Sequence, residues 1–410
     1  MKALTFILGV VLAAGGAMGI LTEKLGQNNV EVDCVQCPYF AGANSPLELR
    51  ARQLSTNVGE ENAQKAIPLF RELLWRDSQN PYRWADLGEA FLEAGQKKQA
   101  QECYGEVLAL APHSAPSLLR VANFYFQIGE NNLALPITAH ILTLTPDYDS
   151  IIFSEYTRLV NHPEEVLAYG VPEDRRAARS WLQYLMQAGR LDDARRTWDW
   201  ATQRGYDDDS TAGEYAGFVL QQGHPDSAVS AWIQHLGVRA GDYLKANYLF
   251  NGNFEFEPAP SPFDWNLGHA KGVEVARDCT TARTENCSLR ISFAGTQNVD
   301  FAAASQLAFV HSGPFHFHAS IRTEGLTTDQ GIRFHICDAE LPARLDVIVG
   351  QFKGTVPWSS VEEDLTLPAQ TRLLRVQVIR RPSMKFDNKI NGTAWIDEMR
   401  LEPISHPSSL

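Results

Sequence analysis

Residues 247–265 read NYLFNGNFEFEPAPSPFDW and divide the sequence into two halves of different character. Upstream, the chain is rich in Ala and Leu, and apolar residues recur at helical spacing. Within the stretch itself, a short alternating run leads into a Pro-rich turn and then an aromatic residue. A period near two is typical of β-strands, whereas a period of 3.6 is typical of helices. The sequence therefore predicts a helical first half and a β-sheet second half, with 247–258 as the first strand.

The first half repeats itself at an interval of 34 residues. Residues 83–112 read RWADLGEAFLEAGQKKQAQECYGEVLALAP. Their small residues and closing proline, Gly88, Gly95, Ala100 and Pro112, are followed 34 positions later by Ala122, Gly129, Ala134 and Pro146. Gly189, Ala194 and Trp198 recur in the same way as Gly223, Ala228 and Trp232. Small residues at these positions allow two helices to approach closely, and proline ends the second helix.

This pattern resembles tetratricopeptide repeats, in which each unit is a helix, a turn and a second antiparallel helix. The resemblance implies an α-solenoid over 47–243, with repeats near 47–80, 81–114, 115–148, 175–208 and 209–242. The interval between Ala134 and Ala194 does not fit, so the unit near 149–174 is expected to be shortened or distorted.

In this family the concave surface of the solenoid generally holds a peptide or protein partner. First-helix residues that do not face the core are the candidates for that contact, and each can equally be a solvated side chain. By helical phase they are Tyr82, Glu89, Asn123, Phe126, Arg179, Gln183 and Gln187.

The second half, 247–403, contains short alternating runs separated by Gly, Pro, Asp and Asn turns, which predicts an antiparallel β-sandwich. Its opening NGNFE and its closing WIDEMRL are similar to the jelly-roll carbohydrate-binding modules. In that family these two ends lie together, often around a structural calcium. The resemblance implies Glu255 and Asp397 as calcium ligands beside Asn251 and Gly252. The alternative is that Asp397 only bonds to backbone amides.

A sugar site needs exposed aromatic rings. Trp265, Trp358 and Trp395 are the obvious ones, but they stand where this family buries its packing residues, so we expect them in the core. Tyr248, Phe301 and His311 are weaker candidates. His316 and His318 fall on one face of a strand without an evident third ligand, so a polar face is expected there rather than a metal site.

Of the six cysteines, four form two close pairs, Cys34 with Cys37 and Cys279 with Cys287. In an oxidising compartment these pairs are typical of local disulfides. The alternative for Cys34 and Cys37, a CxxC redox motif, lacks the strand-helix context of such motifs. Cys103 and Cys337 stand alone.

Residues 1–23 contain an uncharged stretch from Ala3 to Thr22, close to the 20 or so apolar residues that span a bilayer. We expect an uncleaved membrane anchor or a cleaved signal peptide ending near Ala17-Met18-Gly19. A buried core helix is a third possibility. Residues 24–46 then form a linker that carries the CxxC pair, and the rest of the chain is expected in the periplasm or at the cell exterior.

The formal net charge of −13 argues against a nucleic-acid partner. No phosphate loop, nucleophile elbow or zinc-protease motif is present, which argues against an enzyme. The sequence thus predicts a multi-domain α plus β protein: membrane anchor, α-solenoid and jelly roll. The expected function is a non-catalytic envelope adaptor in cell-surface polysaccharide assembly or export. The alternative is an interaction scaffold whose β-domain binds no sugar.

Overall fold

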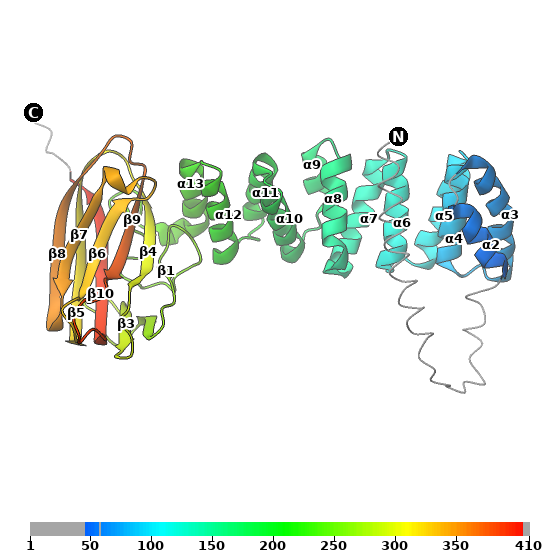
Figure 1. The fold of residues 1–410 in the computed structure, drawn as a ribbon. Helices are drawn as coiled ribbons and strands as arrows, with labels where there is room; N and C mark the ends of the chain where they lie inside the picture. The colour runs from blue at the N-terminus through cyan, green and yellow to red at the C-terminus, as the bar shows by residue number, and fades with distance from the viewer. Residues whose placement is uncertain (1–45, 57–58, 405–410) are drawn as a thin grey trace, which may run out of the picture. The chain divides into compact units, whose positions relative to one another are not determined.

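A computed structural model describes residues 46–56 and 59–404, which form helices followed by two antiparallel sheets (Figure 1). The chain divides into two compact units, 1–121 and 122–410. The predicted anchor over 1–23 and the linker with Cys34 and Cys37 lie outside the described residues. Within the described ranges, no helix has the length and apolar character needed to cross a membrane.

The first unit consists of paired helices. They are α2 (Pro46–Thr56), α3 (Glu60–Arg76), α4 (Pro81–Glu93), α5 (Lys97–Leu110) and the start of α6 (Ala115–Gln127). Helix α4 begins at Asn80, whose side-chain oxygen accepts hydrogen bonds from the backbone N–H groups of Tyr82 and Arg83, and Pro81 occupies the first helical position. It gives way to α5 at Gly95, whose φ of 73° is left-handed and therefore suits glycine.

The helices of the second unit continue the repeat. They are α7 (Asn131–Leu144), α8 (Asp149–Leu159), α9 (Pro163–Glu165), α10 (Arg175–Gln187), α11 (Leu191–Gln203), α12 (Asp209–Gln221) and α13 (Pro225–Leu236), with 3₁₀ turns at η1 (Pro146–Tyr148) and η3 (Gly237–Ala240). Helices α4 and α6, α5 and α7, α10 and α12, and α11 and α13 each begin 34 residues apart. The predicted interval is therefore confirmed as a structural period.

The predicted irregular unit is also found. After α8, the chain forms only α9 and one π-helical turn, η2 (Val166–Gly170), in place of a second long helix. The hydroxyl oxygen of Tyr156 lies 2.7 Å from the Gly170 carbonyl oxygen and 2.7 Å from the Thr138 hydroxyl oxygen. This buried contact ties the irregular turn to α7 and α8.

The close approach expected at Gly88 is present, and it gives a first prediction. A Cβ atom at Gly88 would lie 2.9 Å from the Tyr104 ring. We expect Gly88→Leu to destabilise the first unit by about 1–3 kcal/mol, because it overpacks the contact between α4 and α5. Thermal unfolding followed by circular dichroism measures the effect. Gly105→Leu, at a site in α5 with no atom within 4 Å of the new Cβ, is the control, and an equal loss in both variants would contradict the register.

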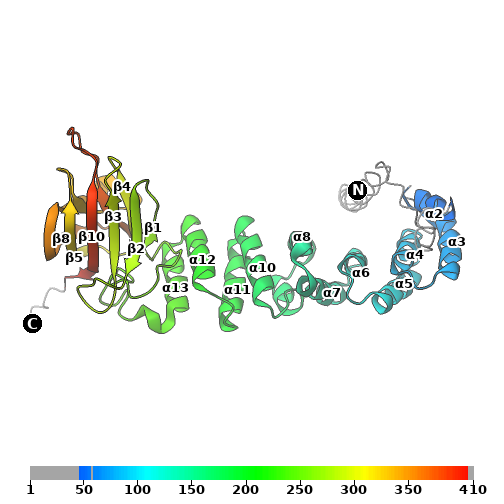
Figure 2. The same ribbon diagram turned by 90° about the horizontal axis from the view of Figure 1, so that it is seen from below.

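The sandwich contains two five-stranded sheets, ordered β1-β4-β9-β6-β7 and β2-β3-β10-β5-β8, with every pairing antiparallel (Figures 1 and 2). The strands are β1 (Asn266–Leu267), β2 (Val273–Asp278), β3 (Ser288–Ala294), β4 (Phe301–Phe309), β5 (Gly313–Leu326), β6 (Ile332–Asp338), β7 (Asp346–Phe352), β8 (Gly354–Leu367), β9 (Leu373–Arg380) and β10 (Asn391–Pro403), with a 3₁₀ turn, η4 (Pro342–Arg344), before β7. Alternate apolar residues of both sheets, including Phe317, Phe334 and Ile396, form one core.

The prediction of a first strand over residues 247–258 is wrong, because these residues do not form a strand. Asn251 and Phe254 have φ values of 51° and 54°, and a strand cannot continue through left-handed residues. The stretch instead forms irregular turns that bond to the end of the chain. The Gly252 carbonyl accepts a 2.9 Å hydrogen bond from the Met399 N–H, and a Cβ atom at Gly252 would lie 1.9 Å from the Met399 carbonyl oxygen. The two ends of the β-domain therefore meet at a glycine.

Candidate functional site

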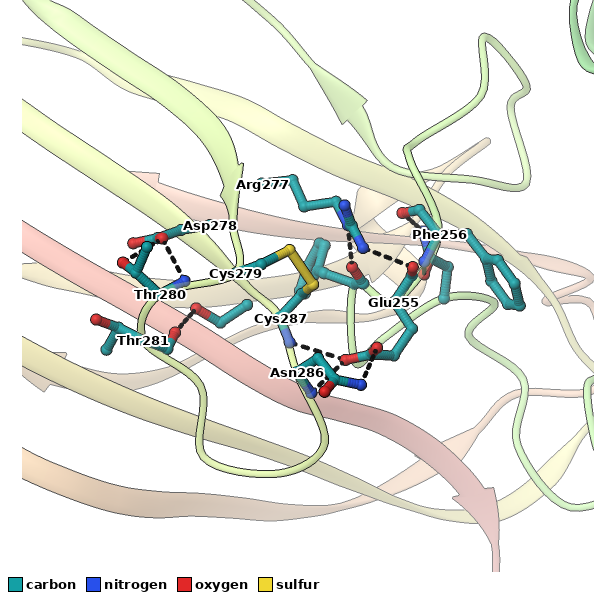
Figure 3. Close-up of a disulfide and its surroundings, with 12 residues drawn as sticks. Glu255, Phe256, Arg277, Asp278, Cys279, Thr280, Thr281, Asn286 and Cys287 are labelled. Atoms are coloured by element: carbon teal, nitrogen blue, oxygen red, sulfur yellow. Dashed lines mark hydrogen bonds between the residues drawn. A yellow bond between two sulfur atoms is a disulfide. The ribbon is translucent and has the colours of Figure 1, made fainter.

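The predicted disulfide between Cys279 and Cys287 is present, and it closes a loop between β2 and β3 (Figure 3). The loop is braced from within. The Thr280 N–H donates a 2.9 Å hydrogen bond to the Asp278 carboxylate, and the Ser288 hydroxyl donates a 2.6 Å bond to the Thr281 carbonyl. Cys103 and Cys337 are buried free thiols.

Glu255 holds one side of this loop (Figure 3). Its carboxylate accepts hydrogen bonds of 2.9 and 2.8 Å from the backbone N–H groups of Asn286 and Cys287, and a third of 3.2 Å from the Asn286 side chain. Burial raises the pKa of Glu255, but the hydrogen bonds from Asn286 and Cys287 outweigh it and hold the pKa below its ordinary value. Arg277 donates to the carbonyls of Phe254 and Glu255 at 2.7 Å each, which fixes the backbone that carries this carboxylate.

Asp397 holds the same loop from β10, and its side chain is 0% exposed. One carboxylate oxygen accepts hydrogen bonds of 2.8 and 3.0 Å from the N–H groups of Arg283 and Thr284, and the other accepts a 2.7 Å bond from the Glu398 N–H. Burial raises the pKa of Asp397 above its ordinary value, although these three bonds oppose the shift. Both carboxylates are therefore loop anchors.

These residues do not fit the calcium site that the resemblance implied. Calcium needs several oxygen ligands, whereas Glu255 and Asp397 both point their oxygens at N–H donors, which take the place of a cation. In the described part of the chain, no group of three or more His, Cys, Asp or Glu side chains is placed to hold a metal. The alternative for Asp397, bonding to backbone amides, is the geometry observed.

The clamped loop forms one wall of a polar cleft of about 490 Å³. Asn251, Glu285 and Glu398 line the cleft, and all three have left-handed φ values, between 51° and 53°. Both glutamates are already bonded, because Glu285 accepts a 2.8 Å bond from Asn253 and Glu398 lies 3.0 Å from the Arg283 guanidinium.

The prediction that all three tryptophans lie in the core is right for one of them only. Trp265 is buried in the core as expected, at 1% exposure. Trp358 and Trp395 are half-exposed and lie outside the core cluster, so their predicted core role is wrong. The reason is strand alternation, since the neighbours of Trp395, Ala394 and Ile396, both point inward. The weaker sugar candidates do not form a platform: Phe301 is buried, and Tyr248 packs edge-on against His311 and Phe315.

On the outer face of the second sheet, Trp395 lies between two arginines. Trp395 of β10 pairs with Arg290 of β3 on one side and Arg322 of β5 on the other. The register of β8 shifts opposite Arg322: Ser359 pairs with Ile321 and Val356 with Thr323, so Pro357 and Trp358 together lie opposite Arg322 in a bulge. The order across the strands is therefore Arg290, Trp395, Arg322 and then the bulge that contains Trp358, and we call these four residues the Trp-Arg row.

The Trp-Arg row is fixed by neighbouring carboxylates. The Trp395 ring N–H donates a 2.9 Å hydrogen bond to Asp278, and the Arg322 guanidinium lies 5.2 Å from the centre of the Trp395 ring. Arg290 bonds to Glu274 at 2.8 Å. Neither arginine was among the predicted site residues, although the alternation in FHFHASIR places Arg322 on the same strand face as His316 and His318.

The two histidines continue this face as polar residues, as expected. His316 lies 2.7 Å from Asp364, and His318 lies 3.5 Å from Glu362, each directly opposite on β8. The face therefore carries aromatic rings at one end and hydrogen-bonding pairs at the other.

The predicted partner-binding residues of the helices divide into three kinds. Arg179 and Gln183 both bond to Glu214 of the next first helix, at 2.9 Å, and Glu89 bonds to Arg120 at 3.1 Å. These side chains join successive first helices. Tyr82 and Gln187 are exposed, and Asn123 is half-buried, so all three can contact a partner. The prediction that Phe126 contacts a partner is wrong: its side chain is only 7% exposed, because an apolar ring is more stable out of water.

No protein-family profile matches the chain, and no curated protein sequence matches it. Solved structures similar to part of the chain include TmCBM61 in complex with beta-1,4-galactotriose, at 17% identity and a TM-score of 0.29, covering 38% of this chain and 99% of that one. A CBM4 structure matches at 14% identity and 0.28, covering 38% and 99%. MamA from Desulfovibrio magneticus RS-1 matches at 14% and 0.23, covering 48% and 99%. These TM-scores are too low to carry a functional argument.

Proposed function

We propose that this protein is a non-catalytic adaptor that binds a glycan through the Trp-Arg row of its β-domain and a protein partner through its helices. The single observation that carries the glycan assignment is the pair of partly exposed tryptophans, Trp358 and Trp395, on the two strands that flank β5 in one sheet. Indole rings stack on the apolar faces of sugar rings, and the flanking guanidinium and carboxylate groups offer hydrogen bonds to hydroxyls.

We also propose a more specific assignment of the fold. The strand orders β1-β4-β9-β6-β7 and β2-β3-β10-β5-β8 support a jelly roll, and the helix pairs at 34-residue spacing support a tetratricopeptide-like solenoid over 47–243. In such a solenoid the first helices line the concave surface. Tyr82, Asn123 and Gln187 are the predicted contact residues whose side chains remain accessible.

The proposed location is the bacterial envelope, with the chain tethered or exported by residues 1–23. The Cys279–Cys287 disulfide supports an oxidising compartment, since disulfides are rare in proteins that stay in the cytosol. A glycan-binding domain joined to a protein-binding solenoid suits cell-surface polysaccharide assembly or export.

Alanine substitution of the row tests the glycan assignment. We expect Trp395→Ala and Trp358→Ala each to weaken binding about tenfold or more, the loss of about 1.4 kcal/mol or more, on a glycan array and in titration with the best ligand. Phe386→Ala is the control, because Phe386 is a fully exposed aromatic residue of the same domain outside the row. Thermal unfolding checks that all three variants stay folded.

Two outcomes would replace the proposal. A wild-type chain that binds no polysaccharide on the array favours the scaffold whose β-domain binds no sugar. Release of shorter sugars from a bound glycan would make the protein an enzyme.

A further inference from the structure

The connection between β9 and β10, residues 381–390, projects past the ends of the neighbouring strands (Figure 2). Two of its side chains, Met384 and Phe386, are fully exposed, at 97% and 105% of their reference areas. A fully exposed phenylalanine gains nothing from the rest of the chain, and burying it elsewhere would be favourable by about 1.5–3 kcal/mol. Two such residues on one loop form an apolar tip.

The tip is surrounded by cations, although the whole chain carries a net charge of −13. Arg381, Lys385 and Lys389 are exposed and lie on the same connection, against one acidic residue, Asp387. Asp329, from the connection between β5 and β6, lies 3.8 Å from the Lys385 ammonium group, and the Lys385 side chain stays 72% exposed. The loop is therefore locally basic in an acidic protein.

The base of the loop is rigid. Arg380, which is fully buried, donates a 2.9 Å hydrogen bond to the Asn298 side chain and a 3.2 Å bond to the Asn388 carbonyl. Asn298 also bonds to the backbone N–H and carbonyl of Ser383, both at 2.9 Å. Fixing residues 380, 383 and 388 holds the tip away from the sandwich, so Met384 and Phe386 are presented outward.

This combination favours a lipid surface over a protein as the partner. A protein partner needs a broad contact, whereas two apolar side chains on a narrow projecting tip can enter a deformable lipid surface. Basic residues beside the apolar tip are attracted to anionic headgroups. We propose that residues 381–389 form a lipid-binding tip that inserts Met384 and Phe386 into an anionic membrane surface. This site is separate from the Trp-Arg row and does not depend on the proposed glycan function.

Vesicle co-sedimentation tests the inference. The chain from Lys24 onward keeps every described residue and lacks the uncharged stretch, which would itself enter lipid. We expect it to bind vesicles of equal parts phosphatidylglycerol and phosphatidylcholine at least tenfold more tightly than vesicles of phosphatidylcholine alone. Added salt should weaken the binding. The double variant Met384→Ser/Phe386→Ser and the charge variant Lys385→Glu/Lys389→Glu should each lose binding at least tenfold, with unchanged thermal unfolding.

Val238→Ser is the matched control, because Val238 is a fully exposed apolar residue outside the loop. Trp358→Ala is a second control, expected to lose glycan binding and keep vesicle binding. Failure of the wild-type chain to bind anionic vesicles, or equal binding by the wild-type chain and the Met384→Ser/Phe386→Ser variant, overturns the inference.

Discussion

Gly213→Ala is expected to open the contact between helix α12 and the β-domain, although alanine is the better helix former. A Cβ atom at Gly213 would lie 2.2 Å from the Pro260 carbonyl oxygen and 3.0 Å from the Ser261 Cα. Both are backbone atoms, so either helix α12 or the segment with Pro260 and Ser261 has to move by about 1 Å or more. The contact lies inside the second unit, where the Arg372 guanidinium also bonds to Asp226 of α13 at 2.7 Å. We expect a net cost of about 2–3 kcal/mol, at the upper end for overpacking.

Gly217→Ala is the matched control for this experiment. It lies one turn further along α12, and its new Cβ would meet only the Pro262 side chain, at an ordinary 3.9 Å. Alanine in place of glycine inside a helix gains up to about 1 kcal/mol. Gly217→Ala should therefore be neutral or stabilising. Hydrogen exchange across 258–263 and urea unfolding measure both variants, and equal behaviour of the pair would show that α12 does not hold the β-domain.

The helical half could be predicted from the sequence because its determinants are local and repeated. A small residue such as Gly88 or Ala122, a turn glycine such as Gly95 or Gly129, and a closing proline specify each unit wherever it lies in the chain. The irregular unit was located by the same logic, since a break in the interval is visible without knowing its structure. The π-helical turn that fills it could not be predicted, because it depends on the buried contacts of Tyr156.

The β-half was harder to predict from the sequence, because the contacts that determine its structure join residues far apart in the chain. Alternation predicted an antiparallel sandwich over 247–403, but it gave residues 247–258 the wrong structure. The turns that contain Asn251 and Phe254 bond to residues far along the chain, because Gly252 accepts from Met399 and Phe250 pairs with Gln306. Local sequence does not show such contacts.

The candidate site could also be predicted only in part from local sequence. The resemblance correctly linked Glu255 and Asp397 to one place, yet their partners are amides of a loop that was considered only for its disulfide. The outward position of Trp395 follows from strand alternation, but the sequence analysis placed it by family position instead. Arg290 and Arg322 became candidates only when the strand register aligned them with the tryptophans.

Asp397→Ala is expected to lower the free energy of unfolding of the β-domain by about 3 kcal/mol, the same in calcium and in chelator. The substitution leaves the N–H groups of Arg283, Thr284 and Glu398 without their acceptor. Each buried donor left unsatisfied costs about 1–3 kcal/mol. Water can reach the loop and reduce this cost, so the total stays near the value of one or two such donors. Urea unfolding of the chain from Lys24 onward, followed by tryptophan fluorescence, measures the change.

The calcium comparison decides what the two carboxylates do. If loop amides are their only partners, chelator at matched ionic strength leaves the wild-type midpoint unchanged, since calcium then has no site to bind in the folded state. Asp397→Asn should cost less than Asp397→Ala, because the amide oxygen still accepts hydrogen bonds from the loop. Glu255→Gln, which keeps an acceptor at a partly exposed site, should be milder still. A wild-type midpoint that rises with calcium, and stops rising in Asp397→Asn, would restore the metal site and overturn the amide clamp.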